Sequence, residues 1–346
     1  MEFAQDWAAS RARYEAWWRN DVLDRPVVVM ESRREKLRWP LKPGVEAVAP
    51  ERFYFDAQAR VDDMENVLAA TDYLGDAAPL ARRGINTGYL GLFAGAAPLF
   101  AGGKKRTVWV EPFVQDWDAL PRPRFDTEAP AFKAILEVSD ALVERGRGRY
   151  LVAIPDHLDA VTTMSQMRGV EAMMLDIMDN PGPVCRFRDE LTAVWTQSRA
   201  FWFERDQRQG LDGSSTYPFT WSSRCGGVTQ CDFSSMISPA MFDLVTRPEL
   251  EAEASRLDCA MYHLDGPGEL AHVDALCRIP GITAIQWVPG AGRPRAFAWR
   301  DLLTTLQDRG KPIQVYFAPQ DLDDLFAFLR PQGLMLYCLV RCDAAT

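Results

Sequence analysis

Two short stretches of this sequence place residues capable of chemistry directly after an apolar run. The run 259–262 leads into His263 and Asp265, and the run 282–285 leads into Gln286. Both stretches then reach Gly and Pro, which is typical of places where the strands of a parallel α/β protein expose their chemistry. His263 and Asp265 are two residues apart, so on an extended backbone they point to one side and could converge on one metal ion or one substrate group.

A second acid–base candidate follows another apolar run. Asp156 and His157 come after the segment 150–154, and neighbouring Asp and His side chains could act as general acid and base. We therefore predict catalytic roles for His263, Asp265, Asp156 and His157. The alternative for the second pair is that Asp156 caps a helix and His157 lies at the surface.

Substrate-binding roles are predicted for polar and aromatic residues at or beside the ends of the apolar runs. They are Trp109, Glu111, Tyr217, Asp232, Tyr262, Gln286, Trp287 and Tyr316. Glu111 could bind a cationic substrate or ligate a metal, and its alternative role is to pair with a nearby Arg. For the aromatic residues the alternative is core packing, which is the more common fate of aromatic side chains.

Short apolar strands that alternate with helices would position these residues. The apolar runs are 27–30, 107–110, 150–154, 227–233, 259–262, 282–285, 313–317 and 334–340. The Gly- and Ala-rich segment 79–103 is predicted to be loop with a short helix. Eight strands in alternation with helices predict a single (β/α)8 TIM barrel over 1–346, with an N-terminal helical extension over 1–26. A doubly wound open sheet is the alternative.

Composition limits the class of partner. The 346 residues carry a formal net charge of −9, and Lys and Arg are scattered among acids, which argues against a nucleic acid or an anionic membrane. We therefore expect a small-molecule substrate. No apolar run approaches the ~20 residues that span a bilayer, and the first residues are acidic where a signal peptide would be basic, so we expect a cytoplasmic protein. The 7 Cys residues show no regular spacing of the kind that a disulfide framework has.

Four sequence segments carry a resemblance to a known family. They are Tyr262–Gly268, Ile285–Gly292, Gln230–Phe233 and Ile237–Phe242. Together they resemble the uroporphyrinogen decarboxylase superfamily, within it the branch of cobalamin-dependent (corrinoid) methyltransferases. The resemblance implies a TIM barrel with its site at the carboxyl ends of the strands. It also implies transfer of a methyl group between a small methylated compound and a corrinoid carrier, with a corrinoid protein as a possible partner.

The same resemblance implies a zinc ion held by a His-x-Cys pair and by a Cys near the end of the chain. His263 matches the His of this pair, whereas Asp265 stands in place of the Cys. Cys342 would supply the third ligand, with Cys338 as the alternative. Zinc accepts His, carboxylate and thiolate ligands, so this set is chemically admissible.

Two alternatives to a methyltransferase remain open from the sequence. One is a decarboxylase or other lyase acting on a small carboxylate or a tetrapyrrole, with Asp and His working without a metal. The other is a non-catalytic tetrapyrrole-binding protein. Uroporphyrinogen decarboxylases themselves carry an Arg-rich motif near the first strand. This chain has Glu31–Glu35 there, with two Arg in a different setting, which argues against a polycarboxylated porphyrinogen as substrate.

Overall fold

The structure, a computed structural model, describes residues 1–100 and 108–340 and is built around one seven-stranded sheet. The strand order is β2-β1-β13-β12-β11-β10-β9, and every neighbouring pair is parallel except β2 with β1. The strands are β1 (Val27–Arg33), β2 (Thr71–Gly75), β9 (Gly226–Gln230), β10 (Cys259–Asp265), β11 (Ile282–Val288), β12 (Ile313–Tyr316) and β13 (Leu334–Val340).

Three smaller two-stranded sheets accompany the central one. They are the parallel pair β3 (Leu80–Ala81) with β6 (Leu151–Val152), and the antiparallel pairs β4 (Pro98–Phe100) with β5 (Val108–Val110) and β7 (Ser214–Thr216) with β8 (Thr220–Ser222). The amide of Ile154 donates to the carbonyl of Ser215 at 3.0 Å, which joins the end of β6 to β7. The amide of Gly226 donates to Ser214 Oγ at 2.8 Å, which joins β7 to the start of β9.

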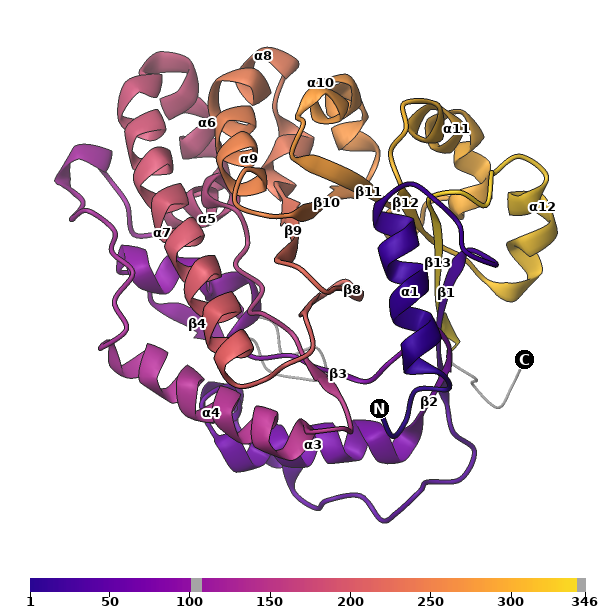
Figure 1. Ribbon diagram of the computed structural model, residues 1–346. Helices are drawn as coiled ribbons and strands as arrows, with labels where there is room; N and C mark the ends of the chain where they lie inside the picture. Colours follow the sequence, from indigo (N-terminus) through magenta and orange to yellow (C-terminus); the bar gives the residue numbers. More distant parts are fainter. Residues whose placement is uncertain (101–107, 341–346) are drawn as a thin grey trace.

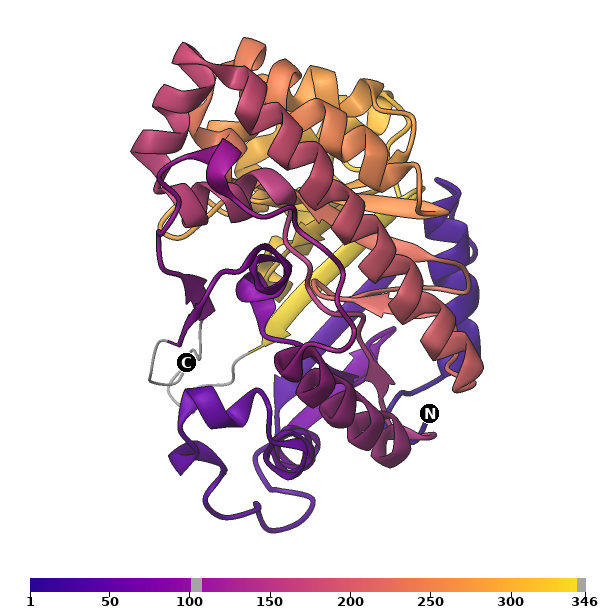
Figure 2. The same ribbon diagram turned by 90° about the vertical axis from the view of Figure 1, so that its left-hand side faces the viewer.

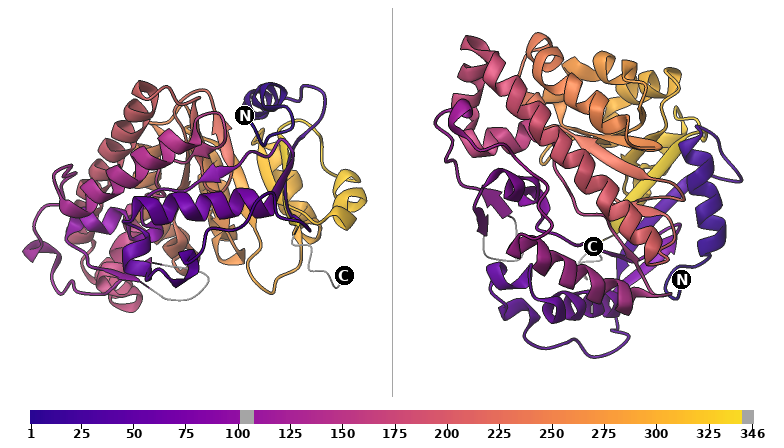
Figure 3. Two further views of the ribbon diagram at one scale, coloured as in Figure 1. Left: turned by 90° about the horizontal axis from the view of Figure 1, so that it is seen from below. Right: turned by 60° about the vertical axis from the view of Figure 1, so that its left-hand side comes forward.

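Helices cover the outside of the strands (Figure 1). They are α1 (Trp7–Trp18), α2 (Pro50–Phe53), α3 (Ala57–Ala70), α4 (Pro130–Gly146), α5 (Ala160–Arg168), α6 (Val170–Asp179), α7 (Pro181–Arg208), α8 (Pro239–Met241), α9 (Arg247–Ala254), α10 (Val273–Arg278), α11 (Arg300–Asp308) and α12 (Leu322–Phe326). The long helix α7 runs diagonally down the side shown in Figure 2, and α3 and α4 lie side by side in Figure 3. Within the described residues, no helix combines the length and the apolar character needed to cross a membrane.

The two faces of the sheet pack into different hydrophobic clusters, because successive side chains of a strand point to opposite faces. The inner face carries Val29, Met261, Ala284, Met335 and Tyr337, which pack together with the aromatic residues of α1. The outer face packs against the surrounding helices and carries Tyr262, Leu264, Ile285, Trp287, Leu336 and Cys338. Alternate residues of a strand therefore face either the inner side of the sheet or the surrounding helices.

Helix α1 covers the amino ends of the strands. Asp6 caps the helix by accepting from the amide of Ala9 at 3.1 Å. The indole nitrogen of Trp17 donates to the carbonyl of Ile313, the first residue of β12, at 3.2 Å. Trp18 donates in the same way to the carbonyl of Trp221 at 2.9 Å. With this end covered, the carboxyl ends of the strands are left for a site.

The predicted alternation of strand and helix is confirmed from β9 to β13, whereas one predicted strand of the amino half is wrong. The run 107–110 was expected in the central sheet, but Val108–Val110 forms an antiparallel pair with β4 instead. The strand that pairs with β6 is Leu80–Ala81, inside the segment predicted as loop. Two residues are too few to show a period, so sequence pattern alone does not reveal such a strand. The strand pairing establishes a mixed α/β fold with a central, mostly parallel sheet.

Candidate active site

Three carboxylates and one imidazole come together at the carboxyl ends of the strands. Asp156 follows β6, Asp232 follows β9, and β10 carries both His263 and Asp265. The surrounding protein desolvates Asp232 and raises its pKa, although part of this side chain reaches solvent. The charge of His263 lowers the pKa of Asp232, and the charges of Asp265 and Asp156 raise it further. All four groups therefore lie within electrostatic range of one another.

A chain of buried side-chain amides fixes the orientation of His263. The amide nitrogen of Gln314 donates to the backbone carbonyl of Phe219 at 2.9 Å, and a carbonyl oxygen only accepts. The oxygen of Gln314 therefore accepts from the nitrogen of Gln286, and the oxygen of Gln286 faces Nδ1 of His263. Because this oxygen also only accepts, His263 donates from Nδ1, so Nε2 is the nitrogen without a proton whenever the ring is neutral. Both Gln side chains are fully buried.

This geometry suits two kinds of chemistry. A neutral imidazole whose Nδ1–H is held by an oxygen can offer Nε2 to a metal ion or take up a proton as a general base. Asp232, with its raised pKa, retains a proton at higher pH than an ordinary carboxyl group and could act as a general acid. A base and an acid thus stand close together, with the exposed carboxylate of Asp265 beside them.

A cavity of about 520 Å³ opens beside Asp265 at the ends of β10, β11 and β12. This volume lies in the range of ligand pockets. Tyr316 lines it together with two cationic side chains. Arg295 forms an ion pair with the buried Asp321 at 3.0 Å. Arg293 is exposed and has no ion-pair partner within the described part of the chain, so it is available to an anionic group of a ligand.

Tyr217 and Tyr316 both lie at this site. Burial raises the pKa of Tyr316, and the charges of Tyr217 and Asp265 act on it as well. The guanidinium of Arg82 lies 3.9 Å from the ring centroid of Tyr217, and it is 4.0 Å from the carboxylate of Asp156. Sequence reasoning missed Arg82, because the two-residue strand before it carries no recognisable pattern.

Glu31 and Tyr337 extend the site across the inner face, and sequence reasoning did not select them. Burial raises the pKa of Glu31, and it also raises the pKa of Tyr337, which Glu31 and Tyr316 raise further. For Glu31 a signal exists in the sequence, because it directly follows the apolar run 27–30.

His157 lies apart from this group although Asp156 precedes it. Its Nδ1 is 2.7 Å from the carbonyl of Pro155 and therefore donates, and its Nε2 accepts from Ser198 Oγ at 2.9 Å. Burial lowers the pKa of His157 to about 3, and the charge of Arg199 lowers it as well. Both ring nitrogens are thus engaged in a neutral, fully buried imidazole, an arrangement that favours a structural role.

Three further candidates face away from His263. Tyr262, Trp287 and Cys338 belong to the outer face, each being adjacent in its strand to an inner-face residue. Cys338 therefore lies on the opposite side of the sheet from His263. Cys342, the preferred thiolate ligand, lies outside the described residues.

Trp109 and Glu111 lie outside the central sheet. Trp109 is in β5 and Glu111 directly follows that strand, and both side chains are exposed. No described contact links either of them to His263 or Asp265.

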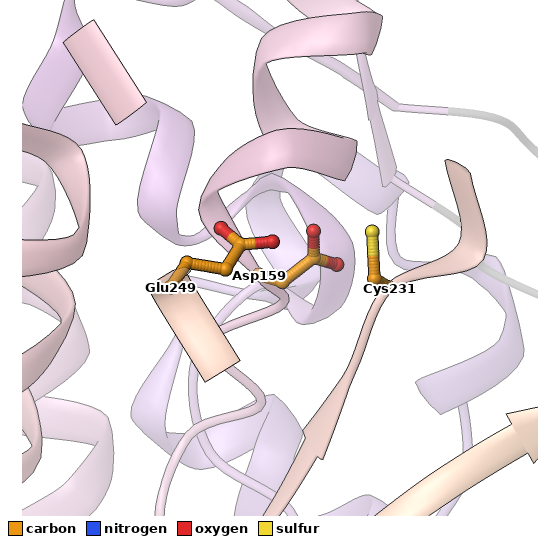
Figure 4. Close-up of side chains that lie close together, drawn as sticks. All are labelled: Asp159, Cys231 and Glu249. Atoms are coloured by element: carbon orange, nitrogen blue, oxygen red, sulfur yellow. The ribbon is translucent and has the colours of Figure 1, made fainter. Parts of the chain in front are cut away.

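A second group of metal-type side chains lies behind the site (Figure 4). Asp159, Cys231 and Glu249 are all buried, and one ligand atom of each lies within 4.8 Å of the others. In the ranges 1–100 and 108–340 this is the one set of three His, Cys, Asp or Glu residues that approach so closely. Sequence reasoning did not select any of the three, which come from segments far apart in the chain.

Comparison with known proteins supports the fold. No family model matches the chain, and no curated protein matches it by sequence. Among solved structures it is similar to a methyltransferase from Methanosarcina mazei, with a TM-score of 0.59 and 13% sequence identity. The match covers 96% of this chain and 93% of that chain. At this level of identity the likeness shows a shared fold and nothing more specific.

Proposed function

We propose that this protein is a methyltransferase that moves a methyl group between a small methylated substrate and a corrinoid carrier. The observation that carries the proposal is the site at the carboxyl strand ends, where His263 is held through Nδ1 with Nε2 left available, Asp232 lies within electrostatic range, and a cavity of about 520 Å³ opens beside Asp265. The similar fold of a protein named as a methyltransferase supports it. A corrinoid protein would be the partner that delivers the carrier.

We further propose that the strands complete a (β/α)8 barrel in one domain. In this arrangement β3 and β6 join β1 and β9–β13 as the eight barrel strands, and β7 links β6 to β9 across the gap between the two ends of the central sheet. The parallel β3–β6 pair and the hydrogen bonds from Ile154 to Ser215 and from Gly226 to Ser214 support it. Closure explains why the site residues come from so many strands, since barrel enzymes gather catalytic groups from the ends of several strands.

In this proposal side chains of the protein accept and donate the protons that methyl transfer requires. A methyl acceptor such as a thiol must lose its proton before it attacks, and His263 Nε2 is placed to receive that proton when it holds no metal ion. In the reverse direction the group that gives up its methyl needs a proton, which Asp232 is placed to donate. Arg293 would hold an anionic part of the substrate in the cavity.

Zinc is the metal that the proposal adds to this site. His263 Nε2 and Asp265 are the described residues that would hold it, with Cys342 as the third ligand. Zinc bound there would polarise the acceptor or the leaving group as a Lewis acid. The described residues do not bring a third ligand atom into a tight cluster with His263, so the metal depends on Cys342 or on Asp232.

A lyase without a metal is the second candidate, and one observation favours it. The pairing of an unprotonated His263 Nε2 with Asp232, whose pKa is raised, already supplies a base and an acid. Decarboxylation or elimination on a small carboxylate needs no third ligand, and Arg293 could bind the carboxylate.

The test is a pair of variants, His263→Ala and Cys342→Ala, with two measurements on each. Metal content per chain is determined, and methyl transfer from candidate methylated donors to free cobalamin is followed. The metal-assisted methyltransferase predicts that both variants lose metal and that transfer falls by ~100-fold or more. Full transfer activity in both variants would overturn the proposal. Absence of methyl transfer in the wild type, with decarboxylation or elimination of a small carboxylate that His263→Ala abolishes at unchanged metal content, would favour the lyase.

A further inference from the structure

The buried group of Asp159, Cys231 and Glu249 draws its members from three separate elements. Asp159 is the N-cap of α5, Cys231 follows β9, and Glu249 lies in the first turn of α9. None is more than 1% exposed. Figure 4 shows the Asp159 carboxylate between the Glu249 carboxylate and the Cys231 sulfur.

Each carboxylate uses one oxygen and leaves the other without a partner. Asp159 Oδ1 accepts from the amide of Thr162 at 2.6 Å, and Glu249 Oε2 accepts from the amide of Val161 at 3.0 Å. The remaining oxygens, Asp159 Oδ2 and Glu249 Oε1, have no hydrogen-bond partner within the described structure. Buried polar atoms in folded proteins are almost always paired, so two unpaired carboxylate oxygens at one place call for a positive partner.

The sulfur of Cys231 completes the set. It lies 3.6 Å from the hydroxyl of Thr246 and 3.8 Å from that of Thr162, and within 4.8 Å of a carboxylate oxygen of both Asp159 and Glu249. One helical turn beyond Glu249, the fully buried Glu253 has neither carboxylate oxygen paired in the described structure. Burial raises the pKa of Glu249 and Glu253, and the charge of Asp159 raises both further. The region therefore holds more buried acid than its cations balance.

We propose that Asp159, Cys231 and Glu249 bind a divalent metal ion of the zinc class. Two carboxylates and a thiolate suit zinc, which takes both oxygen and sulfur ligands. Ligand atoms of a tetrahedral zinc site lie about 3.4–3.8 Å apart, and the three ligand atoms already lie within 4.8 Å of one another, so they need to close in by at most about 1.4 Å. Glu253 is the nearest candidate for a fourth ligand. Binding requires deprotonated ligands and therefore releases protons to solvent.

An ion at this position would hold the backbone of the candidate active site in place. Cys231 directly precedes Asp232, so an ion that fixes Cys231 also fixes the backbone that carries the proposed acid. The ion would join the end of β9 to the starts of α5 and α9. A small pocket of about 20 Å³ is lined by Asp159 and Glu253 from this region and by Asp156 and Tyr217 from the strand ends.

The first experiment replaces the bound metal by Co²⁺, whose absorption reports on thiolate ligation. Purified Cys342→Ala protein, which lacks the thiolate proposed for the strand ends, is stripped with a chelator and titrated with Co²⁺, alongside the same protein carrying Cys231→Ser or Cys259→Ser. Cys259 is an equally buried cysteine on β10, bonded to Ser222 Oγ at 3.2 Å, and serves as the matched control. We expect thiolate-to-cobalt absorption in the Cys342→Ala protein with and without Cys259→Ser, and its loss when Cys231→Ser is added. Absorption that survives Cys231→Ser, or is absent from the Cys342→Ala protein, overturns the proposal.

A second experiment covers the case in which Cys231→Ser fails to fold. Without a metal, Glu249→Gln removes one of several mutually repelling acids, and the melting temperature of the variant at pH 8 should equal or exceed that of the wild type. With a metal, the same variant loses a ligand, and we expect a lower melting temperature that added zinc no longer raises. The metal site is contradicted if Glu249→Gln has an unchanged or higher melting temperature and added zinc changes the melting temperature of neither Glu249→Gln nor the wild type.

The variant His263→Ala separates this inference from the proposed function. It leaves Asp159, Cys231 and Glu249 intact, so metal at this cluster is retained even if metal at the strand ends is lost. Loss of all metal in His263→Ala would assign the ion to the strand ends and overturn the present inference without touching the proposed function.

Discussion

His263 owes its orientation to a backbone carbonyl two side chains away. The carbonyl of Phe219 fixes Gln314, which fixes Gln286, which fixes the ring. Both side-chain amides are buried away from solvent. The donor-to-acceptor direction of this series of hydrogen bonds is therefore set by the carbonyl of Phe219. Outer-shell partners of this kind determine which ring nitrogen is available for chemistry.

The first prediction concerns Gln286→Leu, which keeps the approximate size of the side chain and removes the acceptor. We expect activity to fall by ~10–100-fold, as for other outer-shell partners of functional His residues. Imidazole ¹⁵N chemical shifts of His263 should change from a single Nδ1–H tautomer to a mixture. Gln307→Leu is the matched control, because Gln307 is a buried amide on α11 that donates to the carbonyl of Arg330. An unchanged tautomer in Gln286→Leu would show that the amide chain does not orient the ring.

The second prediction concerns Asp232→Asn. The protein raises the pKa of Asp232, so its proton is held at higher pH than an ordinary carboxyl group would hold it. If Asp232 is the acid, activity declines as pH rises through that raised pKa, and the variant loses both most of its activity and this limb of the profile. Asp243→Asn, at an exposed acid on the surface, is the control and should keep the wild-type profile. If the activity of Asp232→Asn still declines over the same pH range, that decline belongs to another group.

For single residues, the two-residue period of a strand lets the sequence predict which face of the sheet a side chain occupies. The two-residue spacing places His263 and Asp265 on one side of a strand, and the structure has both at the carboxyl end of β10. The same period puts Tyr262 and Trp287 on the other face, so a consistent use of parity would have removed them from the candidates. Asp159 and Glu249 are 90 positions apart, and only the tertiary fold brings them together.

Among the elements, the short strands β3 and β6 are held in place by one buried arginine. Arg83 donates to the carbonyl of Ala153 at 2.8 Å, to Ser139 Oγ of α4 at 2.7 Å and to the carboxylate of Asp206 of α7. Arg83 and Asp206 are 0% and 2% exposed. A strand of two residues has little pairing of its own, so the side chain ties it to two helices instead.

The third prediction follows from this buried ion pair. Asp206→Ala leaves the charge of Arg83 buried and unpaired, and we expect a loss of about 3–5 kcal/mol in the free energy of unfolding. The double variant Arg83→Met with Asp206→Leu should recover much of that loss, because it buries no charge. Asp308→Ala breaks the exposed pair with Arg330 and should cost about 0–1 kcal/mol. Denaturant unfolding curves measure all three, and a small effect of Asp206→Ala would mean that the pair does not hold β3 and β6.

Helix α1 supplies the fourth prediction. Trp17 is 1% exposed and packs against Trp18 with a centroid distance of 4.4 Å, while its nitrogen donates to the carbonyl of Ile313. Trp17→Ala should lower the free energy of unfolding by about 3–5 kcal/mol. Trp109→Ala is the control, since that side chain is 51% exposed and should change stability by less than about 0.5 kcal/mol. Equal effects in the two variants would show that α1 adds little to the fold.

How much of the element pattern can be derived from sequence depends on strand length. The strands β10, β11 and β13 span seven residues each and stand out as apolar runs. In the amino half β1 also stands out as an apolar run, whereas the strands β2 to β6 have two to five residues, too few for a period to develop. The composition of β5 is similar to that of a strand in the central sheet. Only its antiparallel pairing with β4 shows that it lies outside that sheet.

For the whole molecule, a set of buried acids makes stability depend on pH. Asp159, Glu249, Glu253 and Glu269 are each at most 1% exposed, and burial is the main cause that raises the pKa of each. A carboxyl group with a raised pKa binds its proton more tightly in the folded chain than in the unfolded one. The folded state is therefore favoured at low pH and loses this advantage as pH rises through the raised pKa.

The fifth prediction uses Asp159, whose pKa is raised from 3.8 to about 7. In chelator-treated protein this difference corresponds to a contribution on the order of 4 kcal/mol that is present below about pH 4 and is lost between about pH 4 and 7. Asp159→Asn keeps an N-cap for α5 without an ionisable group, so its free energy of unfolding should fall less between pH 5 and pH 7.5 than that of the wild type. Urea unfolding at the two pH values measures the difference, with Asp56→Asn, an N-cap on the partly exposed start of α3, as the control. Equal pH dependence in Asp159→Asn and the wild type would show that Asp159 is ionised in the folded chain. Because a bound cation favours the ionised carboxylate, added zinc should flatten the wild-type dependence and leave that of Asp159→Asn unchanged.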